Sequence, residues 1–209
     1  MDSDPAPCPH RRVHERGDGR RRHLALMFTD IVASTSLLLD VGDEEWLHVL
    51  RWHDTVVRSC LARGGGREVK QVGDGFFAVF EDASSALGCA LDIQRSLADG
   101  RDQGRPRVHV RIGIHRADVL EAAGDYVGRG VHEAARITEL AGADEILASA
   151  HALDRSHPAV DGSPWREVRL RGMPETVELV TVNSSPTLAP SPKCPGRPRR
   201  GGARVTGRA

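Results

Sequence analysis

The sequence predicts a mixed α/β (α+β) domain in which helices pack on one central sheet. Three observations indicate this class. Apolar residues run almost unbroken through residues 23–31, as in a buried strand. Two stretches, 42–66 and 84–100, carry apolar residues at helical spacing. Between them, "REVKQVGDGFFAVF" (67–80) has apolar runs on both sides of an Asp-Gly pair, which is a strong hairpin signal.

The first long helix has recognisable ends. Asp43 is placed to cap its start, and Glu44 and Glu45 lie in the first turn, where carboxylates are favoured by the helix dipole. Three glycines at 64–66 stop it. Its apolar positions are Trp46, Val49, Leu50, His53, Val56, Val57 and Cys60. The second helix is expected to start near Asp82.

The elements after the second helix complete the predicted topology. We expect a strand at 107–122, a helix at 128–142, a short strand at 145–149 and a hairpin around 172–175. Irregularities are expected in the long strand at Gly113 and at 117–118. The order is β-α-β-β-α-β followed by α-β-β-β. The first six elements match the ferredoxin-like split βαβ arrangement.

Composition divides the 209 residues into a body and two tails. Six of the 29 basic residues lie in the first 23 positions and six more in the last 26, which leaves an acidic body. We expect a disordered basic segment at 1–22, one folded domain at 23–183 and a disordered Pro- and Gly-rich tail at 184–209. We interpret the tails as solvated termini rather than as contacts for nucleic acid or acidic lipid.

The cysteines and the hydropathy narrow the class of protein further. The four cysteines (Cys8, Cys60, Cys89 and Cys194) form no CxxC pair, which argues against a zinc site or a disulfide framework. Cys60 and Cys89 fall on helical patterns, where a buried thiol acts as a small hydrophobe. No apolar run approaches the ~18 residues that a membrane span requires. The sequence therefore predicts a soluble, cytoplasmic protein.

Two acidic residues stand at the ends of predicted strands. Asp30 ends the first strand and is followed by the small residues of "IVAST", a turn that can offer backbone N–H groups to phosphate. Asp74 lies at the tip of the hairpin, beside the first strand in a ferredoxin-like sheet. Either acid alone is more often a turn or cap residue. Their joint placement, with Lys70 nearby, favours a site for Mg²⁺ or Mn²⁺.

Five blocks of the sequence resemble, in order and spacing, the catalytic domain of class III nucleotide cyclases. They are "LMFTDIVAST", "GGGREVKQVGDGFFAVF", "VRIGIHRADV", "GDYVGRGVHEAARITELAG" and "LRGMPETVEL". The resemblance covers roughly residues 22–182. Five blocks in order are far more specific than the Gly-Asp-Gly alone.

The resemblance implies a metal site and a reaction. Asp30, Asp74 and the backbone carbonyl of Ile31 would hold two Mg²⁺ or Mn²⁺ ions on a nucleoside triphosphate, beside the turn with Ser34 and Thr35. The ribose 3′-hydroxyl would attack the α-phosphate, giving a 3′,5′-cyclic monophosphate and pyrophosphate. Active sites in the family lie between two subunits, so the resemblance also implies a homodimer.

The resemblance assigns recognition of the purine base to two residues. Lys70 and Asp125 match the family's purine-selecting pair. Adenine has an acceptor at N1 and a donor at N6, and a Lys donor with an Asp acceptor complements this edge. ATP is therefore predicted over GTP.

The resemblance assigns stabilisation of the transition-state charge to residues of the third predicted helix, and at one of them the sequence departs from the family. Arg136 matches the family's arginine, whose guanidinium suits phosphate oxygens. The family's asparagine, four residues earlier, is His132 in this chain, and the often-glycine position in the phosphate turn is Ala33. Arg171, in "LRGMPE", matches a basic position that either meets the triphosphate or is a surface residue.

The sequence thus predicts a homodimeric adenylate cyclase, with two alternatives left open. One is a cyclase-like module that binds nucleotide or a regulatory partner without turnover, which the departure at His132 motivates. The other is a ferredoxin-like nucleotidyl transferase that makes linear or dinucleotide products. The absence of a GGDEF-like run after the hairpin argues against this last alternative.

Overall fold

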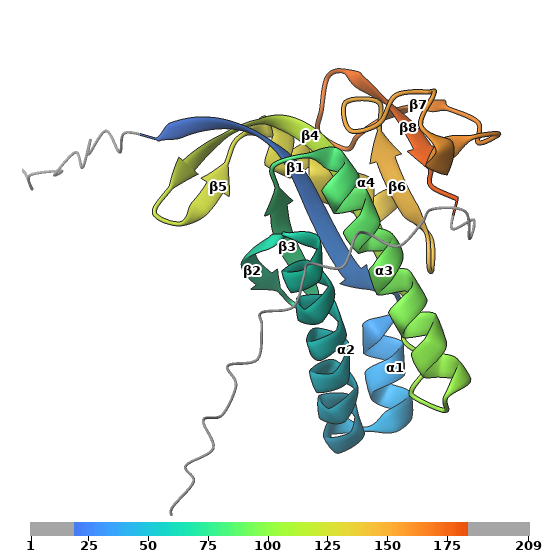
Figure 1. Cartoon of the computed structure of the whole chain (residues 1–209). Coiled ribbons are helices and arrows are strands. Elements are labelled where there is room, and N and C mark those ends of the chain that lie inside the picture. Colours follow the sequence, from blue (N-terminus) through green and yellow to red (C-terminus); the bar gives the residue numbers. More distant parts are fainter. Residues whose placement is uncertain (1–18, 184–209) are drawn as a thin grey trace, which may run out of the picture.

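A computed structural model describes residues 19–183, and the two predicted tails lie almost wholly outside these residues. The elements are β1 (Arg20–Ile31), α1 (Ser34–Val41), α2 (Asp43–Gly64), β2 (Arg67–Val72), β3 (Gly75–Phe80), α3 (Ala83–Asp102), β4 (Val110–Ala122), β5 (Asp125–Val127), α4 (Arg129–Leu140), β6 (Ile146–Ser149), the 3₁₀ helix η1 (Pro158–Val160), β7 (Arg166–Arg169) and β8 (Thr176–Thr181). Figure 1 shows the helices arranged around one twisted sheet.

The sheet confirms the predicted ferredoxin-like core. Its strand order is β2-β3-β1-β4-β6-β8-β7, and β5 pairs with β4 off this path. Neighbours within β2-β3-β1-β4 are antiparallel, as in a split βαβ arrangement. Strand β6 joins β4 in parallel, and the β7–β8 hairpin completes the sheet.

The two faces of the sheet bury different side chains because alternate residues of a strand point to opposite faces. Ala25 and Met27 of β1 pack in the main core with the buried positions of α2 and α3. Leu24 and Leu26 lie in a second cluster, with Ala134 of α4. Helices α2 and α3 thus cover one face and α4 the other. Cys60 and Cys89 are buried free thiols in the main core, as expected.

Strand β1 starts earlier than predicted. It begins at Arg20, so residues 20–22, which the sequence had placed in the disordered segment, pair with Val119–Glu121 of β4. The extra length makes β1 and β4 a long two-stranded arm, visible on the left of Figure 1 with β5 along its edge. The expected irregularities of β4 at Gly113 and at 117–118 are wrong, because its register with β1 is continuous from Val110 to Glu121.

Two turns also differ from the prediction. Helix α1 was not predicted, and Gly42 separates it from α2. The N–H of Gly42 donates to the carbonyl of Leu38 at the end of α1, and the carbonyl of Gly42 accepts from the N–H of Trp46 in α2. Asp43 is therefore the first residue of α2 and makes no side-chain cap. In the β2–β3 hairpin the two loop residues are Gly73 and Asp74 rather than Asp-Gly, because Val72 pairs with Gly75.

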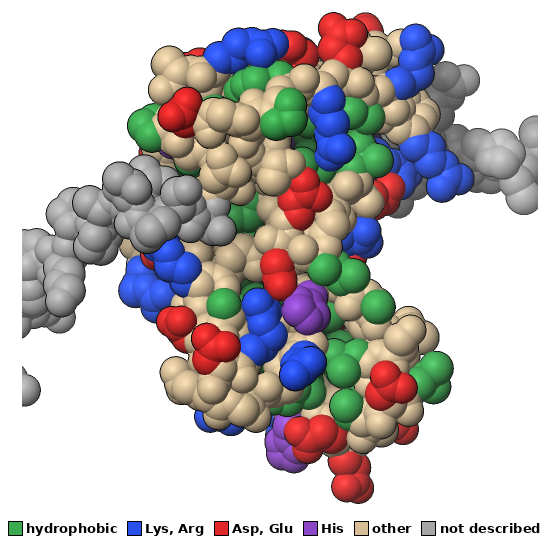
Figure 2. Space-filling view, turned by 90° about the vertical axis from the view of Figure 1, so that its right-hand side faces the viewer, with side chains coloured by type: hydrophobic (Ala, Val, Ile, Leu, Met, Phe, Trp, Pro, Cys, Tyr) green, Lys and Arg blue, Asp and Glu red, His purple; other side chains and the backbone are tan. Residues whose placement is uncertain are grey.

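The surface carries mixed charge. Figure 2 shows acidic and basic side chains interspersed on one face, with small groups of apolar side chains between them. Within residues 19–183, none of the helices combines the length and apolarity that crossing a bilayer requires.

Candidate active site

The tip of the β2–β3 hairpin is pressed against the end of β1. Gly75 makes this possible, since a Cβ atom there would lie 1.9 Å from the carbonyl oxygen of Thr29. The N–H of Phe76 donates a hydrogen bond to Oγ1 of Thr29, at 3.0 Å. This packing brings Asp74, in the hairpin loop, beside Asp30, the residue after Thr29. The predicted convergence of the two carboxylates is present.

Electrostatics at Asp30 reflect this crowding. Burial is the main cause that raises the pKa of Asp30 above its usual value; the hydrogen-bonded Arg111 opposes the rise, and the neighbouring Asp74 carboxylate adds to it. Two carboxylates that repel one another favour a bound cation between them. Carboxylates bind a metal ion through oxygen atoms, which are the ligands that Mg²⁺ and Mn²⁺ prefer. Within residues 19–183 no group of three or more His, Cys, Asp or Glu side chains is arranged to hold a metal ion, so this pair would hold the ions with backbone, water or substrate oxygens.

A hollow of about 320 Å³ opens beside Asp74. The hydroxyl residues Ser34 and Thr35, at the start of α1, line it together with the hairpin loop. Its apolar wall is formed by Leu38, Trp46 and Leu50. The predicted phosphate turn and the predicted metal acid therefore face the same space.

The turn between Asp30 and α1 has an unusual backbone. Ala33 has φ 54° and ψ 35°, a left-handed conformation that glycine adopts more easily. The turn is held by the N–H of Val32, which donates to the carbonyl of His109 at 2.8 Å. Ile31, the residue predicted to offer a backbone carbonyl, is 2% exposed as a whole residue, so its backbone and its side chain are both covered in the single chain.

Arg111 is a residue of this site that sequence reasoning missed. It lies on β4 directly opposite Asp30. Its Nε and Nη2 atoms donate to Oδ2 of Asp30 at 2.8 and 2.6 Å, and its Nη1 donates to the backbone carbonyl of Glu139 at 3.1 Å. The available signal was the alternation of β4, which cannot be used before the register of β4 against β1 is known.

Lys70 and Asp125 form a separate group. Lys70 lies on β2 and Asp125 at the start of β5, and Nζ of Lys70 donates to Oδ2 of Asp125 at 2.5 Å. The other carboxylate oxygen of Asp125 accepts from the N–H of Tyr126 at 2.8 Å. Both side chains are about half exposed, at 47% and 40%. The structure thus brings the predicted base-selecting pair together, with a donor and an acceptor side by side.

The residues predicted on α4 are accessible. His132 is exposed, and Arg136, one turn later, is part-exposed. Arg136 donates from Nη1 to both carboxylate oxygens of Glu139, at 2.5 and 2.7 Å, and this contact raises the pKa of the guanidinium. Arg171 is exposed in the β7–β8 turn, and no side-chain hydrogen bond joins it to other residues of the described range. Glu175, in the same turn, pairs with Arg129 at the start of α4.

Comparison with known proteins identifies the family. The family model for the adenylate and guanylate cyclase catalytic domain matches residues 19–183, the whole described range. This chain belongs to that family. An adenylate cyclase of Streptomyces coelicolor is 32% identical over 139 residues, which are 65% of this chain and 35% of that protein. A putative adenylate cyclase 3 of Rhizobium meliloti is 30% identical over 196 residues, 86% of this chain and 32% of that protein. The chain thus spans about a third of the length of these two relatives.

Solved structures show the same fold. The guanylyl cyclase Cya2 aligns with a TM-score of 0.72 at 22% identity, covering 83% of this chain and 98% of that one. The adenylyl cyclase CyaB from P. aeruginosa aligns with a TM-score of 0.69 at 23% identity, covering 80% of this chain and 97% of that one. These likenesses confirm the architecture of the cyclase domain.

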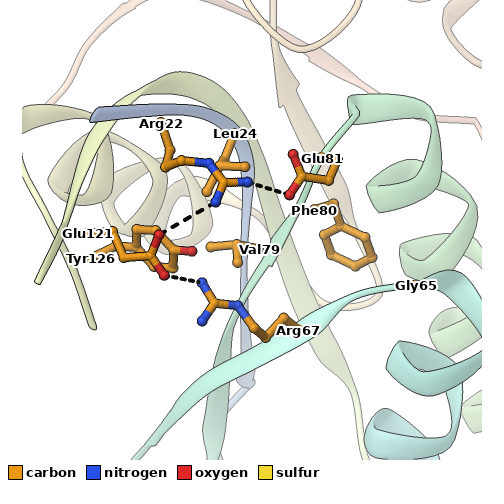
Figure 3. Close-up of a pocket in the computed structure, with 9 residues that line it drawn as sticks. All are labelled: Arg22, Leu24, Gly65, Arg67, Val79, Phe80, Glu81, Glu121 and Tyr126. Atoms are coloured by element: carbon orange, nitrogen blue, oxygen red, sulfur yellow. Dashed lines mark hydrogen bonds and ion pairs between the residues drawn. The ribbon is translucent and has the colours of Figure 1, made fainter. Parts of the chain in front are cut away.

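A second hollow lies at the other end of β1 from Asp30 (Figure 3). Arg22 and Arg67 face one another across Glu121, with contacts of 3.5 and 3.2 Å, and Arg22 also donates to Glu81 at 2.5 Å. The floor is apolar, and Tyr126 lies under the guanidinium of Arg67. Because each arginine is paired with a carboxylate, this hollow of the cyclase domain braces the β1–β4 arm against β2 and carries no free charge for a ligand.

A buried polar network anchors α4 of the cyclase domain to the sheet. His115 of β4 is 2% exposed; its Nδ1 lies 2.8 Å from Oγ of Ser149 and its Nε2 lies 3.1 Å from Oε2 of Glu133. Arg129 donates to the other oxygen of Glu133 at 2.8 Å. Burial is the main cause that lowers the pKa of His115 to about 4, against the attraction of Glu133. The neutral imidazole thus fixes α4, and with it His132 and Arg136.

Proposed function

We propose that this chain is the catalytic domain of a homodimeric adenylate cyclase, which converts ATP to 3′,5′-cyclic AMP and pyrophosphate with two divalent cations. The observation that carries the proposal is the convergence of Asp30 and Asp74 beside a hollow lined by Ser34 and Thr35. Acids and a phosphate-binding turn in one space suit a triphosphate that arrives with its metal ions. The names of the adenylate cyclase relatives agree with this proposal.

The residues would divide the work as follows. Asp30, Asp74 and the carbonyl of Ile31 would hold the ions, which supply acidification of the 3′-hydroxyl and neutralisation of phosphate charge. The backbone N–H groups and hydroxyls at the start of α1 would bind phosphate oxygens. No side chain in this set is a strong general base, and in the two-metal scheme none is required.

Lys70 and Asp125 support the preference for ATP. With Nζ of Lys70 donating to adenine N1 and Asp125 accepting from N6, each polar group of the base would find a partner. Guanine would place its N1–H against the ammonium and its O6 against the carboxylate, leaving buried groups unpaired, which such sites reject strongly. The solved neighbours include guanylyl cyclases, so ATP and GTP have to be compared directly.

Arg136 and His132 would serve the transition state. Both project from one face of α4, one turn apart. In the resting chain Arg136 is held by Glu139, and it would exchange this carboxylate for phosphate oxygens when the nucleotide binds. His132 can donate a hydrogen bond to a ribose or phosphate oxygen, although with a geometry different from that of asparagine.

The dimer is supported by the separation of these groups. The hollow beside Asp74 is lined without Lys70, Asp125 or Arg136. A site that needs all of them would therefore combine the metal acids of one chain with the base and transition-state residues of a second. By two-fold symmetry, such a dimer would have two equivalent sites.

The decisive experiment measures cyclic nucleotide formation by purified protein with Mn²⁺ and either ATP or GTP, over a dilution series. We expect cyclic AMP to exceed cyclic GTP, and the specific activity to fall on dilution below the dimer dissociation constant. Mixing a Lys70→Ala chain with an Asp74→Ala chain, each inactive alone, should restore one intact site per heterodimer. A mixture as inactive as its parents, beside an active wild type, would contradict the shared sites.

A second candidate function rests on the exposed His132 at the family's asparagine position. It is a nucleotide-binding or regulatory module without turnover. The same assay distinguishes the two: bound ATP with no cyclic product at any pH would favour the module.

A further inference from the structure

The two base-selecting residues lie on strands that are not neighbours in the sheet. Lys70 is on β2, which pairs with β3, and Asp125 is on β5, which pairs with β4. The ladder hydrogen bonds of the sheet therefore do not fix the spacing between these two residues. Their direct contact cannot fix it alone in a nucleotide complex, because an adenine edge would draw the ammonium to N1 and the carboxylate to N6.

Arg67 makes a second connection between β2 and the arm that carries β5. Its Nη2 atom donates to Oε1 of Glu121 on β4 at 3.2 Å. Its guanidinium also lies over the ring of Tyr126 on β5, 4.9 Å from the centre of the ring, which is a cation–π contact. Glu121 and Tyr126 are directly opposite one another in the β4–β5 pair. One guanidinium thus holds both strands of the arm, as Figure 3 shows.

Tyr126 transmits this contact to the base-selecting carboxylate. Its N–H donates to Oδ1 of Asp125 at 2.8 Å, and its buried ring meets Phe77 of β3 edge-on, with the ring centroids 6.4 Å apart. Both contacts of the ring, with Arg67 and with Phe77, come from the β2–β3 hairpin. This hairpin also carries Lys70, so the ring ties the position of Asp125 to that of Lys70.

From these contacts we infer that Arg67 is a positioning residue that determines base choice, because it holds Asp125 at the spacing from Lys70 that an adenine edge requires. The inference deepens the proposed function and rests on it. The contacts of Arg67 are made to Glu121 and to the Tyr126 ring rather than to the groups that would meet the base. They can therefore persist while the base is bound.

Arg22 provides the comparison with a purely structural brace. It contacts the other carboxylate oxygen of Glu121, at 3.5 Å, and it donates to Glu81 at 2.5 Å. The cation–π contact with Tyr126, in contrast, is made by Arg67. Loss of Arg22 should therefore loosen the arm as a whole and affect all nucleotides alike.

The test compares ATP with purine riboside triphosphate, which is ATP without the N6 amino group that Asp125 would bind. The value of kcat/KM is measured for both nucleotides with Mn²⁺, and the ratio of the two values reports the Asp125 contact. Arg67→Met should lower this ratio ~5-fold, as part of the ~10-fold or more that a hydrogen bond to a charged group contributes, and should leave the value for the analogue almost unchanged. Arg22→Met should keep the wild-type ratio, because a loosened arm slows both reactions equally.

A double-mutant cycle shows whether Arg67 acts through Asp125. In an Asp125→Ala background the ratio should already be low, and adding Arg67→Met should not lower it further. Glu121→Gln removes the charged partner of Arg67 and keeps the shape of the side chain, so it should lower the ratio in the same direction as Arg67→Met. Thermal unfolding of each variant verifies that the fold is intact.

The outcomes separate the two proposals. A wild type that forms no cyclic product, or that uses ATP and the analogue equally well, contradicts the proposed function, since Asp125 would then not select the base. A wild type that prefers ATP, with the same preference in Arg67→Met, contradicts only the positioning role. An equal fall of the ratio in Arg22→Met, or a further fall when Arg67→Met is added to Asp125→Ala, would also overturn this role.

Discussion

At the scale of single residues, the Lys70–Asp125 pair is the determinant of base choice that we propose. The two side chains lie 2.5 Å apart and half exposed, so each is available to a base edge while the other holds it in place. Sequence spacing alone does not bring strand β2 and strand β5 together. The prediction of this pair came from the resemblance to cyclases, and β5 itself, three residues long, was not predicted.

Reversing the pair should reverse the preference. In Lys70→Glu with Asp125→Lys, the ion pair is kept while donor and acceptor exchange places. Guanine offers N1–H to the carboxylate and O6 to the ammonium, so the ratio of kcat/KM for GTP to that for ATP should rise by at least ~10-fold, the scale of one well-placed bidentate base contact. Each single variant places like charges side by side and should lose activity with both nucleotides. An unchanged ratio in the double variant would exclude the pair from base recognition.

Arg111 was out of reach of sequence analysis for a related reason. Its partner, Asp30, lies 81 positions away, and only the register of β1 against β4 places the two opposite one another. A shift by one residue would have turned the guanidinium to the other face of the sheet. Asp30 and Asp74 were predictable because both stand at strand ends, where topology alone determines which residues meet.

At the scale of elements, periodicity predicted the long helices and strands, the short strand β6 and the β7–β8 hairpin, but it missed α1, β5 and η1. Helices α2 and α3 and the β2–β3 hairpin follow patterns of many residues, and α3 begins after Asp82 as expected, with its carboxylate accepting from the N–H of Ser85. Helix α1 has eight residues, no side-chain cap and none of its side chains fully buried. Its sequence therefore carries little of the amphipathic signal on which the prediction depends.

The contact of the hairpin with β1 provides a test at this scale. Gly75→Ala would place a methyl group against the backbone of Thr29, which cannot move without breaking the sheet. We expect a loss of about 3 kcal/mol in the free energy of unfolding, at the upper end of typical overpacking, together with loss of the Asp30–Asp74 geometry. Gly88→Ala is the matched control in α3, where a Cβ meets nothing within 4 Å and should stabilise by about 0.5–1 kcal/mol. Urea unfolding of both variants measures these changes; equal stability of Gly75→Ala and wild type would contradict the close approach.

At the scale of the whole molecule, the buried network around His115 joins strands β4 and β6 to helix α4. Its ring contacts Ser149 of β6 and Glu133 of α4, and the ring of His151 lies 5.3 Å away. Arg129 completes the network and also pairs with Glu175 of the β7–β8 turn. Unfolding exposes all of these groups together, so the protonation of His115 is linked to global stability.

The linkage has a definite sign. The pKa of His115 is lowered from 6.5 to about 4 in the folded chain, first by burial and further by His151 and Arg129, although Glu133 acts in the opposite direction. Above about pH 7 the residue is neutral in both states and contributes no pH dependence. As the pH falls from 6.5 towards 4, His115 binds its proton in the unfolded chain but not in the folded one. Its titration should therefore lower the free energy of unfolding by up to about 3 kcal/mol. His115→Gln removes this titration and should flatten the decline of the unfolding free energy over this range. His48→Gln, at an exposed position of α2, should keep the wild-type profile; a wild-type decline that persists unchanged in His115→Gln would assign the acid sensitivity to other groups.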